Sequence, residues 1–165
     1  MQAKRGFTLV EILIVVVILG ILAAIVIPQF TQASTEAKEN SLCSNLQSLR
    51  SQIELYKCQH NDNAPTLDDF EEQMIYCTDI DGNRAGTPSK VRETGAGATV
   101  IYGPYLERVP DNPFNNDNTL AAMAASGTPA ADTGDNTGWQ YFEDTGEIFA
   151  NDDGSTASGT PHASL

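Results

Sequence analysis

A single acidic residue, Glu11, lies inside the most apolar part of this 165-residue chain, where every residue from Ile12 to Ile27 is apolar or glycine. A carboxylate there costs about 2.5–3.5 kcal/mol on entering a bilayer, so it needs a cationic partner. No Lys or Arg follows until Lys38. A cut between Gly6 and Phe7 would create an α-amino group four residues from Glu11. The amine of a neighbouring helix, staggered by about one turn, could meet this acid and set the register between subunits.

The other reactive side chains do not form a catalytic set. The two histidines are His60, in a turn-rich segment, and His162, near the end of the sequence. Pairing Cys43 with His60 would require seventeen residues of helix to fold back on themselves. No HExxH, GxSxG or P-loop pattern occurs. We therefore predict that the protein is not an enzyme.

Three cysteines, Cys43, Cys58 and Cys77, lack the spacing of a zinc site. On a continuous helix Cys43 and Cys58 would be about 22 Å apart, whereas a disulfide needs Cα atoms within about 7 Å. If this part of the chain is outside the cytoplasm, Cys58–Cys77 is the better disulfide prediction.

Net charge argues against nucleic acid as a partner. Nine Lys and Arg against 22 Asp and Glu give a formal charge of −13, which repels phosphate backbones. Six aspartates in Gly- and Asn-rich stretches could supply oxygen ligands for calcium: Asp111, Asp117, Asp132, Asp135, Asp152 and Asp153. Acids in such loops are usually solvated, so we assign no metal or other cofactor, and calcium binding stays open.

The apolar segment Phe7–Phe30 would make about 36 Å of helix, enough to cross a hydrocarbon core of about 30 Å. Lys4 and Arg5 precede it, which predicts a cytoplasmic N-terminus. An ordinary secretory signal fits badly, because the apolar stretch is too long and ends without a small-x-small cleavage site. A plain membrane anchor would leave Glu11 without a role.

The stretch KRGFTLVEILIVVVILGILAAIVIPQF resembles the class III signal of type IV pilins and type II secretion pseudopilins. The resemblance implies that a prepilin peptidase cuts after Gly6 and N-methylates the new N-terminal residue, Phe7. It also implies that Glu11 contacts the N-terminus of an adjacent subunit. Pro28 matches the family's helix-kinking proline, because a residue without an N–H leaves a carbonyl unpaired one turn earlier.

An amphipathic pattern follows Pro28. Five residues at i, i+4, i+7, i+11 and i+14 form one apolar stripe: Leu42, Leu46, Leu49, Ile53 and Tyr56. The stripe is too short for a sustained coiled coil, so we expect a helix over 31–58 that packs on a sheet.

Shorter signals predict elements of the body. Thr66–Asp69 has capping-box spacing and predicts a short helix that reaches Met74. Asp79–Gly82 resembles the start of a calcium loop but lacks the later Gly and Glu of an EF-hand, so it predicts a turn. Ala98–Tyr102 predicts a strand.

A hairpin signal follows near the C-terminus. Gly138–Phe142 and Gly146–Phe149 flank a turn and predict paired strands. Residues 115–137 and 151–165 contain few large apolar side chains, which predicts a mobile loop and a flexible tail.

Two motifs in the body, YLERVPDNPFN and GWQYFEDTGEIFAN, resemble segments of the G-type major pseudopilins and related pilin-like proteins. The acidic calcium-binding loop of the classical G-type C-terminus does not align here residue by residue. The resemblance implies an α+β, pilin-like fold, in which a long N-terminal helix kinked near Pro28 packs through its second half on a small antiparallel sheet. The expected parts are a leader (1–6), a transmembrane or filament-core helix (7–30), a globular domain (31–150) and a flexible tail (151–165).

These patterns predict a structural subunit of a type II secretion pseudopilus. The alternatives are a type IV pilus subunit for adhesion, motility or DNA uptake and, less favoured, a membrane-anchored binding domain. The sequence lacks two C-terminal cysteines that would bracket a variable loop, which favours the pseudopilus. The implied partners are prepilin peptidase, identical and related subunits, and an inner-membrane assembly platform. The expected location is the inner membrane with a periplasmic body, and then a periplasmic or cell-surface filament.

Overall fold

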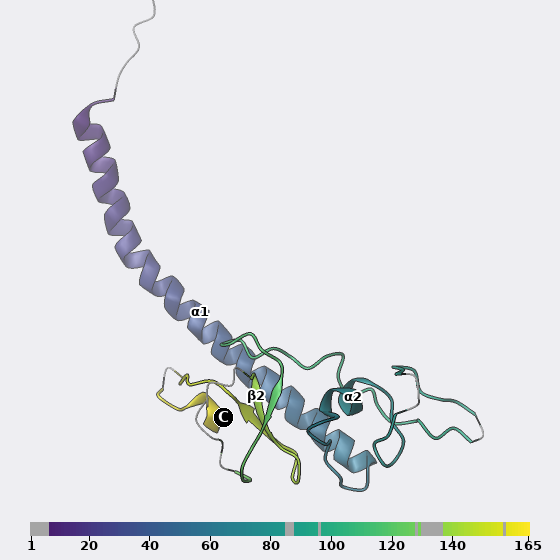
Figure 1. Ribbon diagram of the computed structural model, residues 1–165. Helices are drawn as coiled ribbons and strands as arrows, with labels where there is room; N and C mark the ends of the chain where they lie inside the picture. The colour runs from purple at the N-terminus through teal and green to yellow at the C-terminus, as the bar shows by residue number, and fades with distance from the viewer. Residues whose placement is uncertain (1–6, 85–87, 96, 128, 130–136, 157) are drawn as a thin grey trace, which may run out of the picture. The chain divides into compact units, whose positions relative to one another are not determined.

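The computed structural model describes residues 7–84, 88–95, 97–127, 129, 137–156 and 158–165. The chain divides into two compact units, Met1–Ala37 and Lys38–Leu165. One helix, α1 (Leu9–Gln59), runs through the first unit and into the second (Figure 1). We refer to Lys38–Leu165 as the domain.

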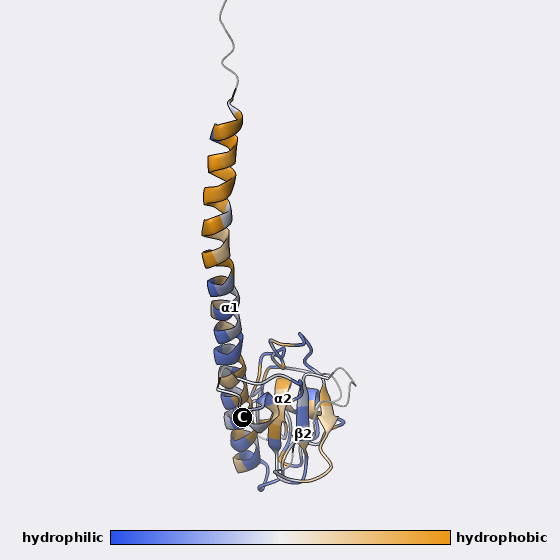
Figure 2. Ribbon diagram, turned by 90° about the vertical axis from the view of Figure 1, so that its left-hand side faces the viewer, coloured by the Kyte–Doolittle hydropathy of each residue, from blue (hydrophilic) through white to orange (hydrophobic). Residues whose placement is uncertain are grey.

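The N-terminal part of α1 exposes its apolar side chains on every face. Figure 2 colours most of this part of the ribbon as hydrophobic, and none of the apolar window is buried. Such a surface is stable only in contact with lipid or other apolar helices. Pro28 lies inside α1 without ending the helix. The kink expected there stays a prediction.

The second half of α1 forms one wall of the domain core. The predicted stripe is confirmed, since Leu42, Leu46, Leu49, Ile53 and Tyr56 are all buried. These side chains belong to one apolar cluster with residues of the sheet and of the short helix α2 (Phe70–Ile75). Trp139 and Phe70 are among its largest members.

The sheet has three strands in the order β1 (Leu120–Ala122), β2 (Trp139–Phe142) and β3 (Glu147–Ala150). The predicted hairpin is confirmed, because β2 and β3 pair antiparallel with Gln140 opposite Phe149. The expectation of a purely antiparallel sheet is wrong, because β1 runs parallel to β2. β1 lies in the segment predicted to be a mobile loop, and its short, Ala-rich sequence carries almost no strand signal.

Two local predictions in the body need correction. Ala98–Tyr102 is not a strand, and only Tyr102 forms an isolated bridge, with Thr78. The predicted capping box does not cap α2, which begins at Phe70 after an Asp69 that makes no side-chain cap. The backbone N–H of Thr66 instead donates to the side-chain oxygen of Gln73. The helix starts too late for the Thr66 side chain to reach its first N–H groups.

The end of the chain, predicted to be a flexible tail, is packed in its described part. A short 3-10 helix, η1 (His162–Ser164), contacts β3. His162 and Asp152 are buried and share a hydrogen bond of 2.6 Å. Composition misled the prediction here, because buried polar contacts hold this segment together with one large apolar residue, Leu165, which packs against the core.

Candidate processing and assembly segment

Glu11 takes part in a reciprocal cap at the start of α1. The backbone N–H and the hydroxyl of Thr8 each donate to Oε2 of Glu11, both at 2.7 Å. The N–H of Glu11 in turn donates to the Thr8 hydroxyl at 3.3 Å. Since α1 begins at Leu9, Thr8 is the N-cap and Glu11 the third helical residue, which is a capping box. The T-x-x-E spacing of Thr8 and Glu11 is the sequence signal from which this cap could have been predicted.

The cap leaves part of the Glu11 carboxylate available. Both bonds from Thr8 end on Oε2, and among the residues described here Oε1 has no hydrogen-bond partner. The side chain is exposed, as is the Phe7 side chain beside it at 83%. The carboxylate is therefore held in one orientation while one oxygen can still accept a second donor.

The other residues predicted for processing and assembly fall in different places. Gly6 lies outside the described residues, so the cleavage between Gly6 and Phe7 stays a prediction. Pro28 lies in the exposed apolar part of α1, five turns beyond Glu11 by helical geometry. By length and composition, α1 is the one helix among the described residues that could cross a membrane.

The cysteines do not form the predicted disulfide. Cys43, Cys58 and Cys77 are all free thiols. Tyr56 and His60 place their side chains in the core, and Cys58 lies between them in sequence, about 200° around the helix from each. Its side chain is exposed on the far side of α1, whereas Cys77 is buried. Burial also raises the pKa of the Cys77 thiol.

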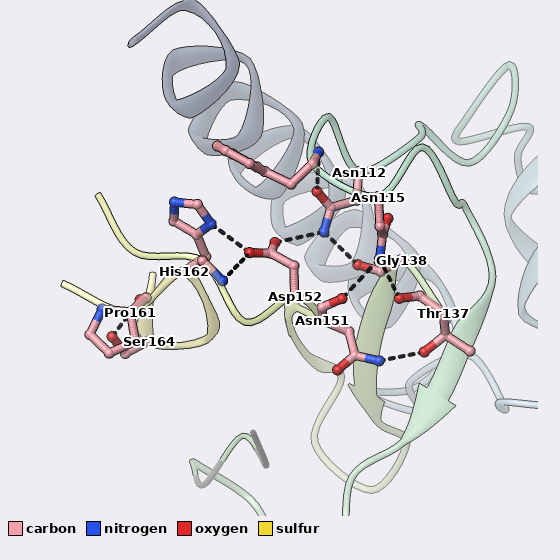
Figure 3. A network of polar contacts seen from close by, with 11 residues as sticks. Asn112, Asn115, Thr137, Gly138, Asn151, Asp152, Pro161, His162 and Ser164 are labelled. Carbon is pink, nitrogen blue, oxygen red and sulfur yellow. Dashed lines mark hydrogen bonds and ion pairs between the residues drawn. The ribbon is translucent and has the colours of Figure 1, made fainter. Parts of the chain in front are cut away.

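A second polar cluster lies at the end of the domain (Figure 3). The Asn112 side chain donates to the Gly138 carbonyl at 3.0 Å and to Asp152 at 2.9 Å, and Asp152 pairs with His162 at 2.6 Å. The Asn115 amide donates to the Thr137 and Asn151 carbonyls. These amide side chains join the loops at residues 112–115, 137–138 and 151–152 by hydrogen bonds.

The aspartates considered for calcium do not gather in the structure. Asp132 and Asp135 lie outside the described residues, and Asp152 is paired with His162. Hydrogen bonds from Thr119 lower the pKa of Asp117. Asp111 accepts from Arg108, and Asp153 is exposed. Within the described ranges, no group of three or more His, Cys, Asp or Glu residues could hold a metal ion.

Comparison with known proteins agrees with this arrangement. Residues 1–27 match the prokaryotic N-terminal methylation motif. The chain is 30% identical over 129 residues to the type II secretion system core protein G of Klebsiella michiganensis, with 76% of this chain and 79% of that protein covered. It is 29% identical over 151 residues to the Vibrio cholerae protein of the same name, with 92% of this chain and 93% of that protein covered. No solved structure matches.

The methylation-type start, the exposed apolar helix and the α+β domain define a pilin-like protein. The chain belongs to the family of the type II secretion system core protein G, the major pseudopilins.

Proposed function

We propose that this protein is a structural subunit of a type II secretion pseudopilus and has no catalytic activity. The observation that carries the proposal is the similarity to core protein G, which extends over 92% of the chain in one relative and includes both the leader and the domain. In this proposal prepilin peptidase cuts after Gly6 and methylates Phe7. Residues 7–30 then anchor the subunit in the inner membrane until it enters the filament.

The orientation that we propose places the N-terminus in the cytoplasm and the domain in the periplasm. Lys4 and Arg5 precede the apolar segment, and the strongly acidic domain follows it. The assembly partners would be copies of this chain and related pilin-like subunits, brought together by an inner-membrane platform. Reporter fusions after Ala37 test the orientation, which would be contradicted by a reporter active only in the cytoplasm.

For assembly, we propose that Glu11 receives the N-terminal amine of a neighbouring subunit on Oε1. The Thr8 cap supports this role, because it holds the carboxylate in place and leaves that oxygen open. A pairing of two charges in an apolar filament core would favour the one stagger that brings them together. The apolar helix surface supplies attraction, and the charge pair supplies register.

Three substitutions separate the cap from the charge pair. Glu11→Gln keeps a side-chain oxygen for Thr8 but removes the negative charge, so we expect a normal helix start and loss of filaments. Glu11→Val removes both the side-chain oxygen and the negative charge, and it should also abolish filaments. Thr8→Ala removes the two hydroxyl bonds of the cap, keeps the bond from the backbone N–H of residue 8 and keeps the charge, so filaments should still form. The readout is pseudopilus formation on overproduction, with membrane insertion of each subunit as the control. Normal filaments from Glu11→Gln would exclude the charge pair.

A further inference from the structure

The Asp152 carboxylate is buried and already surrounded by donors. Its Oδ1 accepts from the backbone N–H of Gly154 at 2.9 Å and from Nδ1 of His162 at 2.6 Å. Its Oδ2 accepts from the side-chain amide of Asn112 at 2.9 Å (Figure 3). N–H groups therefore take three of the roughly four acceptor positions of this buried carboxylate, which leaves little of it for a metal ion.

The His162 ring is fixed mainly by Asp152. The side chain is 1% exposed and lies tilted against the Phe114 ring, with 4.2 Å between ring centroids. Nδ1 carries a hydrogen because it faces a carboxylate oxygen. Nε2 is buried and, among the described atoms, has no hydrogen-bond partner. The bond from Nδ1 is thus the polar contact that selects this ring orientation.

The segment Pro161–Leu165, which we call the strap, is closed through His162. The backbone N–H of His162 donates to the Gly154 carbonyl at 3.0 Å, and the N–H of Leu165 donates to the His162 carbonyl at 3.1 Å. The Leu165 carbonyl accepts from Arg50 of α1 at 2.7 Å. A Cβ atom on Gly154 would lie 2.5 Å from Nδ1 of His162, so a side chain at residue 154 would push the ring away.

We propose that His162, Asp152 and Asn112 form a latch that holds the strap against the domain, with the His162 N–H in the place where a cation would otherwise bind Asp152. The latch closes the end of the chain without a metal ion. The two oxygens of Asp152 accept three N–H donors, so hydrogen bonds from the protein stabilise this buried charge without a cation. The strap should then be closed equally well with and without calcium.

Hydrogen–deuterium exchange on the full chain in detergent tests the latch. We expect the amides of the strap to be equally protected in EDTA and in excess CaCl2. His162→Phe keeps a ring but removes the donor, and should raise exchange in the strap about tenfold or more. His162→Asn can place an amide N–H near the position of Nδ1, and should recover part of the protection. Gly154→Ala should open the strap as His162→Phe does.

Three results would overturn the latch. EDTA could open the strap of the unchanged protein, or CaCl2 could close it in His162→Phe, and either would show that a cation holds it. Equal protection of the unchanged protein and His162→Phe would show that ring packing alone is enough. Protection of β2 and β3 reports whether a variant has kept its core. If His162→Phe loses the protection of β2 and β3, the test rests on His162→Asn instead. The proposal is then rejected if the strap of His162→Asn is no better protected than the strap of Gly154→Ala.

Discussion

Buried tyrosines make the domain sensitive to alkaline pH. Burial, and then the negative charges of Asp79 and Asp69, raise the pKa of Tyr56 from 10.0 to about 12. Burial also raises the pKa of Tyr105 and Tyr141. In each case the folded state holds the phenol proton more tightly than the unfolded chain does.

We therefore expect the free energy of unfolding to fall as pH rises from about 10 towards 12. In this window the unfolded chain releases the Tyr56 proton while the folded domain retains it, and below pH 10 the contribution is constant. Denaturant unfolding at a series of pH values measures the slope. Tyr56→Phe should make it shallower, and an unchanged slope in that variant would mean that Tyr56 does not titrate as described.

Glu11 shows why single residues were only partly predictable. Its isolation in an apolar block indicated a functional acid, and the T-x-x-E spacing could also have indicated the cap. By contrast, nothing near His162 in the sequence pointed to Asp152. Pairs of polar residues that meet through tertiary folding leave no periodic signal, so burial of the chain end could not be predicted.

Arg50 links three elements of the domain. Its side chain lies on α1 and donates through Nε and Nη2 to the Ile148 carbonyl of β3, at 3.2 and 2.9 Å, and through Nη1 to the Leu165 carbonyl. Partial burial lowers the pKa of the guanidinium, which still remains charged in the physiological range.

Arg50→Ala should lower the free energy of unfolding by about 2–3 kcal/mol, because charge-assisted hydrogen bonds to buried carbonyls are lost. Arg108→Ala is the matched control. Arg108 pairs with Asp111 at 3.2 Å on an exposed side chain, so its loss should change stability by less than about 0.5 kcal/mol. Urea unfolding in detergent measures both. Equal effects of the two substitutions would contradict the linking role of Arg50.

Gly138 permits the close approach of two segments at the start of β2. A Cβ atom there would lie 2.0 Å from the Asp117 backbone carbonyl oxygen. The Gly138 N–H donates to the Thr119 carbonyl at 3.0 Å, next to β1. The two parallel strands therefore meet at a point with no room for a side chain.

Gly138→Ala should destabilise the domain by about 2 kcal/mol or more, since backbone must move to admit the methyl group. Gly20→Ala is the same substitution in α1, where an added Cβ would meet nothing within 4 Å beyond its chain neighbours and the helix's own backbone, and it should leave domain unfolding unchanged. The two variants are compared by urea unfolding followed through Trp139 fluorescence. If Gly138→Ala is as stable as the unchanged protein, the backbone at Asp117 can move to admit the methyl group without a cost in stability.

Among the helices and strands, those with a strong local pattern of apolar residues were the ones that the sequence predicted correctly. The α1 stripe and the β2–β3 hairpin were predicted because apolar residues recur with the period of a helix or flank a turn. β1 was missed because Leu120–Ala122 becomes a strand only through pairing with β2. Strand direction is likewise decided by distant pairing, so a parallel strand was not foreseen.

For the whole molecule, processing makes a measurable change in mass. We expect protein purified from membranes to lack residues 1–6 and to carry one methyl group on Phe7. All three cysteines should react with an alkylating reagent after denaturation without reductant, since the structure contains three free thiols. Intact-mass spectrometry measures all of these together. Protein produced without prepilin peptidase is the control, and a mature mass in that strain would assign the cut to another enzyme.

The contacts of Arg50 also constrain when the domain can fold. They join residues separated by 98 and 115 positions, so the partner carbonyls are synthesised long after the helix that needs them. Until residues near 165 have left the ribosome, the apolar stripe of α1 has no complete surface to cover it. Folding that depends on such distant contacts is slow to begin. The core of the domain can therefore be completed only once the residues near 165 are available to α1.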